Sequence, residues 1–175
     1  ALWTVPNTFV ASAKCGLYCG STVDFVDIDP DTFNIDVSQL EKKLKKTNKK
    51  RLPKVLVVVH LAGQPAEIEK IHFLKKKYNF KIIEDASHAL GATRNKINIG
   101  SCKYSDICVF SFHPVKPITS AEGGAALTND KIYYKKMHML RTHGITKNKE
   151  TFIKKKNIGD WYYEQQLLGF NYRMS

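Results

Sequence analysis

The sequence predicts an α/β fold: a mainly parallel central sheet with flanking helices. Two observations carry this prediction. Short runs of β-branched and aliphatic residues alternate along the chain with amphipathic segments of helical period. One of these runs, K-V-L-V-V-V-H at 54–60, is apolar almost throughout, which is typical of a strand buried on both faces of a parallel sheet.

The expected elements follow this alternation. A strand over 23–29 alternates apolar and acidic residues, and a helix then begins at Asp36 or Ser38, where Ser38 and Glu41 stand at capping-box spacing. Segments bounded by Gly, Pro or Asn provide the other expected elements: strand 54–60, helix 66–78, strand 80–84, strand 107–112, strand 125–128 and helix 130–141.

The organisation changes near residue 145. Residues 1–145 carry the alternating elements, whereas 146–175 are polar and lysine-rich, then aromatic. We expect this last stretch to reach toward another subunit or a missing domain. The chain begins at Ala1 inside an expected strand or its exit loop and stops at Ser175 without a terminating signal, so it is expected to be an excised piece.

The composition restricts the possible functions. The net charge of +12 permits nucleic-acid binding, but only four of the 28 basic residues are arginine, the residue favoured for base readout. The lysine runs at 42–50 and 75–77 lie on helices with apolar faces and indicate solvated surface; a third run lies at 154–156. With no long apolar segment or signal peptide, we expect a cytoplasmic protein that binds neither nucleic acid nor membrane.

The four cysteines fit the cytoplasm as free thiols. Cys15 and Cys19 have the spacing of half a metal site, but no comparable pair completes a tetrahedral set. A structural or incidental role is therefore favoured, and no metal is expected.

Two residues at expected strand ends suggest chemistry. Lys116 lies in a loop after a buried strand and is flanked by two prolines, where its amine can form a Schiff base with an aldehyde. Taken alone, a solvated loop lysine is the favoured interpretation. Asp85 follows strand 80–84 and can hold the ring nitrogen of a pyridoxal cofactor, or act as a helix cap or turn former. The hydroxyls of Ser111 and Thr119 suit phosphate oxygens, or ordinary loop hydrogen bonds.

Two motifs, I-I-E-D-A-S-H-A-L-G-A and S-F-H-P-V-K-P-I-T-S-A-E-G-G-A, resemble those of the DegT/StrS aminotransferases of nucleotide sugars. Further matches, in the same order as in the family, are V-P-N-T-F-V-A-S-A, H-L-A-G-Q-P-A, L-R-T-H-G and L-G-F-N-Y-R-M-S. The resemblance implies the aspartate-aminotransferase fold (fold type I) and pyridoxal 5'-phosphate as cofactor. Within the family, the lysine motif resembles transaminases that act on UDP-4-keto-6-deoxy amino sugars, as in the pseudaminic-acid pathway.

The resemblance implies a role for each matched residue. Lys116 bonds the cofactor and then moves the proton between the amino-bearing carbon and the cofactor, while Asp85 pairs with the ring nitrogen. Phe9, otherwise a core phenylalanine, stacks on the ring, and His88, otherwise a structural histidine, lies near it. Ser111 binds the phosphate. Asn171 reaches the phosphate bound by the other subunit, which implies a homodimer with shared active sites.

The implied reaction moves an amino group, with glutamate as the expected donor, to a nucleotide-linked keto sugar in surface-glycan or amino-sugar biosynthesis. The family's upstream Gly/Ser-Thr-Ala phosphate segment and its small carboxy-terminal domain have no counterpart here. Two alternatives remain: a sugar dehydratase of the same family, whose known branch has His at the position of Lys116, and a non-catalytic piece or basic binding module.

Overall fold

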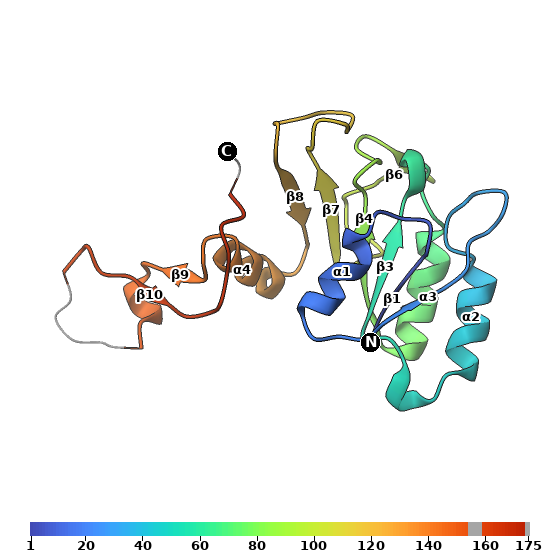
Figure 1. Cartoon of the computed structure of the whole chain (residues 1–175), viewed down its shortest axis with the longest axis horizontal. Coiled ribbons are helices and arrows are strands. Elements are labelled where there is room, and N and C mark those ends of the chain that lie inside the picture. The colour runs from blue at the N-terminus through green and yellow to red at the C-terminus, as the bar shows by residue number, and fades with distance from the viewer. Residues whose placement is uncertain (154–158, 174–175) are drawn as a thin grey trace.

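The computed structural model describes residues 1–153 and 159–173, so the lysine run at 154–156 and the end of the last family motif lie outside the described residues. Six strands form one sheet in the order β2-β1-β3-β4-β7-β8 (Figure 1). Their bounds are β1 Leu2–Thr4, β2 Val23–Phe25, β3 Val55–Val59, β4 Lys81–Asp85, β7 Ile107–Ser111 and β8 Gly124–Leu127. All neighbours are parallel except β7 and β8. The predicted α/β fold with a mainly parallel sheet is confirmed.

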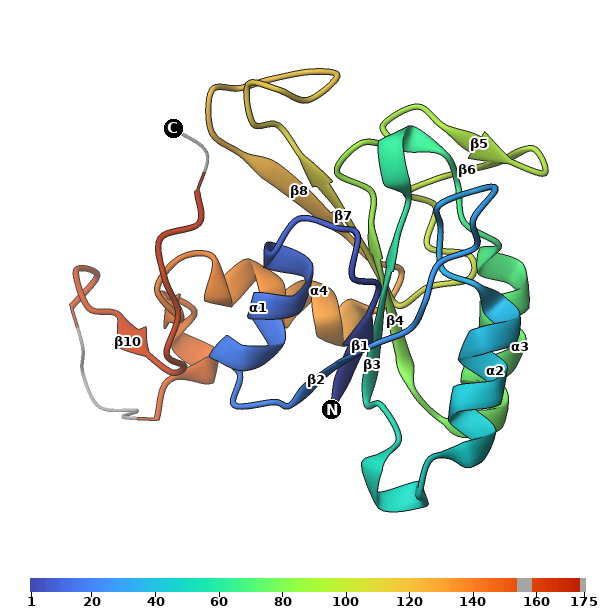
Figure 2. The same cartoon turned by 45° about the vertical axis from the view of Figure 1, so that its right-hand side comes forward.

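In the part of the chain that the structure describes, four α-helices flank this sheet: α1 Ala11–Tyr18, α2 Val37–Lys46, α3 Ile68–Tyr78 and α4 Lys131–Leu140. Figure 2 shows α2 and α3 on one side of the sheet and α1 and α4 on the other. Of the two residues expected to cap α2, Asp36 does so: its carboxylate accepts the N–H groups of Ser38 and Gln39. Glu41 does not complete a capping box and instead pairs with Lys45.

The main core lies between the sheet and the α2–α3 pair. Apolar side chains from both layers are fully buried there, because the helices turn their apolar stripes toward the sheet. Its largest members are Trp3, Leu40, Leu44, Leu56, Ile71 and Ile82. This packing fixes the strand ends from which the candidate site is built.

Near the amino terminus the structure differs from the sequence analysis at two elements. Helix α1 was not predicted, since it has no side-chain cap at its start and carries a glycine inside. That glycine, Gly16, lets α1 approach the sheet: a Cβ there would lie 3.1 Å from the Leu2 side chain and 3.3 Å from that of Val23. Strand β2 is also shorter than expected, because the chain after Phe25 leaves the sheet and Ile28 makes an isolated bridge with Ile35.

Beyond α4 the chain extends away from the sheet (Figure 1). Short strands β9 (Ile145–Thr146) and β10 (Glu164–Gln165) pair antiparallel in this segment, and a second short hairpin, β5 (Thr93–Arg94) with β6 (Ile97–Asn98), follows β4. We call residues 142–153 and 159–173 the arm. Within the described ranges, no helix has the length and apolarity needed to cross a membrane.

The Asp106 carboxylate ties the start of β4 to helix α3. Burial alone would raise the pKa of this carboxyl, but hydrogen bonds from Lys75, the Ile82 N–H and Lys81 outweigh burial and lower the pKa below its ordinary value. A lowered folded-state pKa contributes stability that is present above the ordinary pKa and is lost as the pH falls through the folded-state value.

We therefore expect acid to remove the stabilising effect of Asp106. Urea unfolding of wild type and Asp106→Asn, measured at pH 6 and again near pH 3, should show a free-energy difference that shrinks at the lower pH. A difference that stays constant across this range would contradict the assigned role of the carboxylate.

Candidate active site

The carboxyl ends of the parallel strands gather polar side chains at one edge of the sheet. Asp85 is the last residue of β4, not the residue after it as the sequence suggested, and it pairs in register with Val109 of β7. Ser111 ends β7 two residues further on. Ligands of open parallel sheets bind beyond such strand ends, so this edge is the candidate site.

Two serines hold the Asp85 carboxylate. The Ser12 hydroxyl, from α1, donates to Oδ2 at 2.5 Å. Ser87 donates its hydroxyl to Oδ1 at 2.7 Å and its backbone N–H to the same atom at 3.2 Å. The N–H contact is that of an Asx turn, so Asp85 does form a turn, as the alternative interpretation expected. The three bonds also fix the carboxylate in one orientation, as a charge partner for a bound group requires.

Lys116 and His88 meet in front of this turn. Lys116 Nζ lies 2.9 Å from His88 Nε2. An ammonium group has no acceptor, so the imidazole nitrogen accepts from the lysine. Among the described residues Lys116 has no carboxylate partner within ion-pair distance, and its side chain is half-buried. The lysine predicted to bond a cofactor is therefore next to the histidine predicted to lie beside the ring, three residues from Asp85.

The loop that carries Lys116 closes on itself between β7 and β8. The Lys116 N–H donates to the His113 carbonyl at 2.9 Å, forming a turn. At the loop's ends, the Phe112 N–H bonds to the Gly123 carbonyl and the Ser120 N–H to the Phe112 carbonyl. These bonds and two flanking prolines restrict where the lysine amine can reach.

Phe9 and Ser111 come from the same edge of the sheet. Phe9 stands just before α1 and is 74% exposed, so the alternative that it is a core residue is wrong. Its aromatic ring is free to meet a ligand, three residues before the serine that holds Asp85. The Ser111 hydroxyl accepts the His113 N–H at a long 3.4 Å, and the Thr119 hydroxyl accepts the Ala121 N–H, which is the ordinary loop hydrogen bonding named as the alternative.

Asn171 lies apart from the other predicted residues. It makes a bridge with Thr142 in the arm, and its side-chain oxygen accepts the Arg173 N–H at 3.4 Å. It lines an open groove of about 1030 Å³ between the arm, α4 and β8. Five of the six predicted residues thus come from one edge of the sheet, whereas Asn171 comes from the arm.

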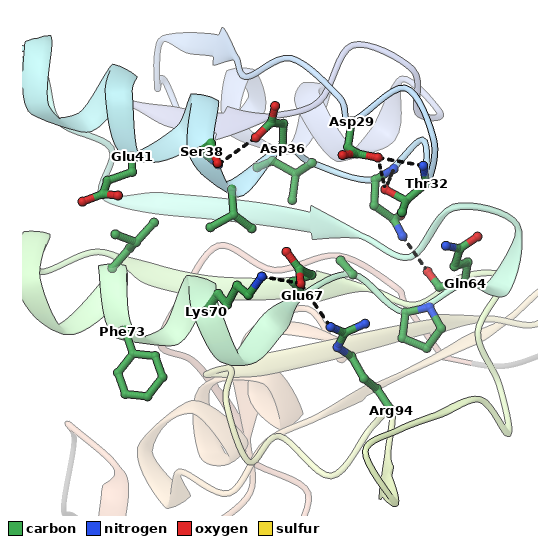
Figure 3. A pocket seen from close by; sticks show the side chains of 16 residues that line it. Asp29, Thr32, Asp36, Ser38, Glu41, Gln64, Glu67, Lys70, Phe73 and Arg94 are labelled. Carbon is green, nitrogen blue, oxygen red and sulfur yellow. Dashed lines mark hydrogen bonds and ion pairs between the residues drawn. The ribbon is translucent and has the colours of Figure 1, made fainter.

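A second cavity, of about 560 Å³, lies between α2 and α3 on the other face of the sheet (Figure 3). Its carboxylates are engaged with neighbouring groups: Glu67 pairs with Lys70 and Arg94, and Asp36 caps α2. None of the residues predicted to carry chemistry lines this cavity.

The cysteines are free thiols. Cys15 lies in α1 and Cys19 directly follows it, and both residues are exposed. Partial burial of the Cys15 Sγ nevertheless raises the pKa of that thiol, which disfavours the thiolate that a metal ligand requires. In the ranges described, no three His, Cys, Asp or Glu side chains converge as a metal site.

Sequence reasoning missed Ser12 and Ser87 as partners of Asp85. Ser87 lies two residues after the aspartate, so the D-A-S sequence was an available sign of an Asx turn. Ser12 had no such sign, because its contact joins residues 73 positions apart.

Fold and site together define an α/β protein with a lysine, an imidazole and a fixed carboxylate at the carboxyl edge of a parallel sheet. The family model of the DegT/DnrJ/EryC1/StrS aminotransferases matches residues 2–175. The chain therefore belongs to the DegT/DnrJ/EryC1/StrS aminotransferase family.

Individual relatives agree with this assignment. The chain is 41% identical over 172 residues to the UDP-4-amino-4,6-dideoxy-N-acetyl-beta-L-altrosamine transaminase of Campylobacter jejuni, covering 98% of this chain and 42% of that protein. Helicobacter pylori PseC, an aminotransferase involved in the biosynthesis of pseudoaminic acid, superposes with a TM-score of 0.82 at 37% identity over 98% of this chain and 42% of its own.

A Streptococcus pneumoniae protein assigned as a sugar aminotransferase, solved in a PLP form, superposes with a TM-score of 0.78 at 28% identity over 99% of this chain and 45% of its own. The same protein has also been solved in a PMP form. The family is thus one of pyridoxal-phosphate-dependent enzymes. The chain spans less than half the length of these relatives.

Proposed function

We propose that this chain provides the cofactor-holding part of a pyridoxal-phosphate-dependent transaminase that aminates a nucleotide-linked keto sugar. One observation carries the proposal: the Lys116 amine lies 2.9 Å from His88, on the same turn as the fixed Asp85 carboxylate. Family membership and the sugar transaminases among its relatives support it.

The residues at the strand edge fit the cofactor. The Asp85 carboxylate is already ordered by Ser12 and Ser87 and would pair with the protonated ring nitrogen. The exposed ring of Phe9 would stack on the cofactor ring, and the Ser111 hydroxyl would bind the phosphate. When bound, pyridoxal phosphate supplies an aldehyde that accepts an amine and a ring that withdraws electrons.

Lys116 has two tasks in this proposal. Its amine would be the group that holds the cofactor, and it would also carry the proton to and from the reacting carbon of the substrate. His88 accepts from this amine and so directs it toward the turn that carries Asp85. The prolines on either side of Lys116 limit the range over which the amine moves.

The proposed substrates follow from the relatives. The Campylobacter jejuni relative is a transaminase named for a UDP-linked amino sugar, and a GDP-perosamine synthase of Caulobacter vibrioides is 38% identical over 98% of this chain and 41% of its own. We propose a nucleotide-linked keto-deoxy sugar as acceptor and glutamate as donor, in surface-glycan or amino-sugar biosynthesis. A cytoplasmic location, supported by the free thiols, is part of the same proposal.

The arm supports a homodimer with shared active sites. It exposes large apolar side chains that a monomer would leave in water: Ile153, Trp161, Tyr163, Leu168, Phe170 and Tyr172. Asn171 lies among them in the chain and makes a bridge with Thr142. Its position suits an asparagine that contacts the phosphate held by a partner subunit, as the sequence resemblance implied.

Product analysis tests the proposed reaction. The protein is incubated with pyridoxal phosphate, glutamate and a UDP-linked 4-keto-6-deoxy amino sugar, and the products are identified by mass spectrometry. We expect an amino sugar and an equal amount of 2-oxoglutarate. A dehydrated sugar with no 2-oxoglutarate would instead place the protein with the sugar dehydratases of the family.

A further inference from the structure

A buried polar network lies directly behind the candidate site. His60, the residue after β3, is 0% exposed, and Glu84, the residue before Asp85, is 4% exposed. His60 Nε2 lies 2.8 Å from Glu84 Oε2, and the Ser105 hydroxyl donates to the other carboxylate oxygen. These three residues, which we call the His60 network, are all buried.

The hydrogen bonds fix the state of the histidine. The Ala66 N–H donates to His60 Nδ1 at 3.0 Å, so Nδ1 carries no proton. The single ring proton is therefore on Nε2 and is donated to Glu84, which accepts from both His60 and Ser105. Every polar atom of the imidazole has a partner, so the ring is held in one orientation.

Two connections link this network to the site. The backbone N–H of His60 donates to the Asp85 carbonyl at 3.0 Å and extends the β3–β4 ladder to the residue that carries the site carboxylate. The bond from the Ala66 N–H to His60 Nδ1 anchors the loop from His60 to Ala66, and this loop packs against the turn that carries His88. Gly63 in this loop has a φ of 85°, and a Cβ on it would lie 2.8 Å from the His88 carbonyl oxygen.

Filling this part of the core would not by itself require polar side chains. Burying a carboxylate and an imidazole costs free energy of desolvation, and apolar residues of similar volume often give equal or higher stability. A satisfied polar network adds a defined orientation of the groups it joins, because hydrogen bonds are directional and apolar contacts are not. The groups oriented here are the end of β4 and the turn that carries His88.

We propose that His60, held by Glu84 and Ser105, is a positioning residue that sets the placement of Asp85 and His88. This inference rests on the proposed function, since it treats these two side chains as groups that meet the cofactor. His60 itself reaches neither cofactor nor substrate; it acts through the backbone of Asp85 and through the loop that backs His88.

The first test uses the chain without cofactor. NMR spectra of wild type, His60→Ala, His60→Gln and His60→Asn are compared at the Asp85 carboxyl carbon and the His88 ring nitrogens. Gln retains a donor toward Glu84, and Asn retains an acceptor toward the Ala66 N–H. We expect the largest shifts in His60→Ala and smaller shifts in the two conservative variants. His138→Ala is the control, since His138 lies on α4 and its ring contacts Tyr134, outside the His60 network.

The second test adds pyridoxal phosphate to the same proteins. We expect His60→Ala to weaken binding about tenfold, by analogy with outer-shell partners of metal ligands, and to change the visible circular dichroism per bound cofactor. If the His60 variants fail to fold, Ser105→Ala, which removes one bond to Glu84, should give smaller changes of the same kind.

The outcomes separate this inference from the proposed function. The positioning role would be overturned if the shifts at Asp85 and His88 in the folded His60 variants were no larger than in His138→Ala. If the His60 variants fail to fold, Ser105→Ala takes their place in this comparison, and the outcome does not depend on the cofactor. A wild-type chain that binds no pyridoxal phosphate at Lys116 would count against the proposed function, while the spectra without cofactor would still decide the role of His60.

Discussion

Replacing Lys116 by alanine is expected to lower the rate of sugar amination at least about 10³-fold. The variant loses both the group that attaches the cofactor and the group that transfers the proton, and general acid–base catalysis alone contributes about 10²- to 10⁴-fold. The rate is measured as amino sugar formed per unit time at saturating pyridoxal phosphate, glutamate and keto sugar. The neighbouring strand ends are unaffected, because the side chain packs in a loop and not in the core.

Lys103→Ala is a matched control. Lys103 is exposed and lies over the Tyr104 ring, away from the Lys116–His88 pair, so its removal should leave the rate within about twofold of wild type. A Lys116→Ala protein that retained a tenth of the wild-type rate would show that another residue moves the proton.

Asp85→Asn is expected to lower the rate at least about 10²-fold while leaving cofactor attachment to Lys116 intact. The amide has the same shape as the carboxylate, but it cannot keep a pyridine nitrogen protonated, so the ring withdraws fewer electrons. The amide oxygen can keep both bonds from Ser87, and the Ser12 hydroxyl can rotate to accept from the new NH2 group, which limits the structural change. Rate and covalent attachment are measured on the same preparation.

Asp130→Asn provides the control for a neutralised carboxylate. Asp130 caps α4 by accepting two backbone N–H groups, and asparagine caps helices about as well as aspartate. This variant should match wild type in rate. Equal losses in Asp85→Asn and Asp130→Asn would mean that net charge, not the site carboxylate, controls the reaction.

The elements that the sequence predicted well are those with strong local patterns. The buried run at 54–60 became β3, and the segments around Leu40 and Ile71 became α2 and α3, because hydrophobic period and capping residues are encoded locally. Helix α1 was missed because it is short, weakly amphipathic and stabilised by packing of Gly16 against the sheet. The antiparallel direction of β8 was not predicted either, since it depends on how the loop after β7 returns.

The residues of the candidate site also divide into those that local sequence patterns predicted and those that they did not. Lys116 and Asp85 were found because each stands at or beyond the end of an expected strand and each matches a family motif. The hydrogen bonds behind them were not found, because they join distant parts of the chain: Ser12 with Asp85, and His60 with Glu84. Sequence patterns predict which residues reach the edge of the sheet, whereas the hydrogen bonds that orient them exist only after the sheet and helices have packed.

The most direct test of the central claim is the position at which this chain bonds its cofactor. The purified protein is mixed with pyridoxal phosphate, reduced with borohydride, digested and mapped by mass spectrometry. We predict one dominant phosphopyridoxyl label, on Lys116, which is absent from Lys116→Ala. A label spread over the exposed lysines, equal in the two proteins, would contradict the assignment of Lys116 as the cofactor-binding residue.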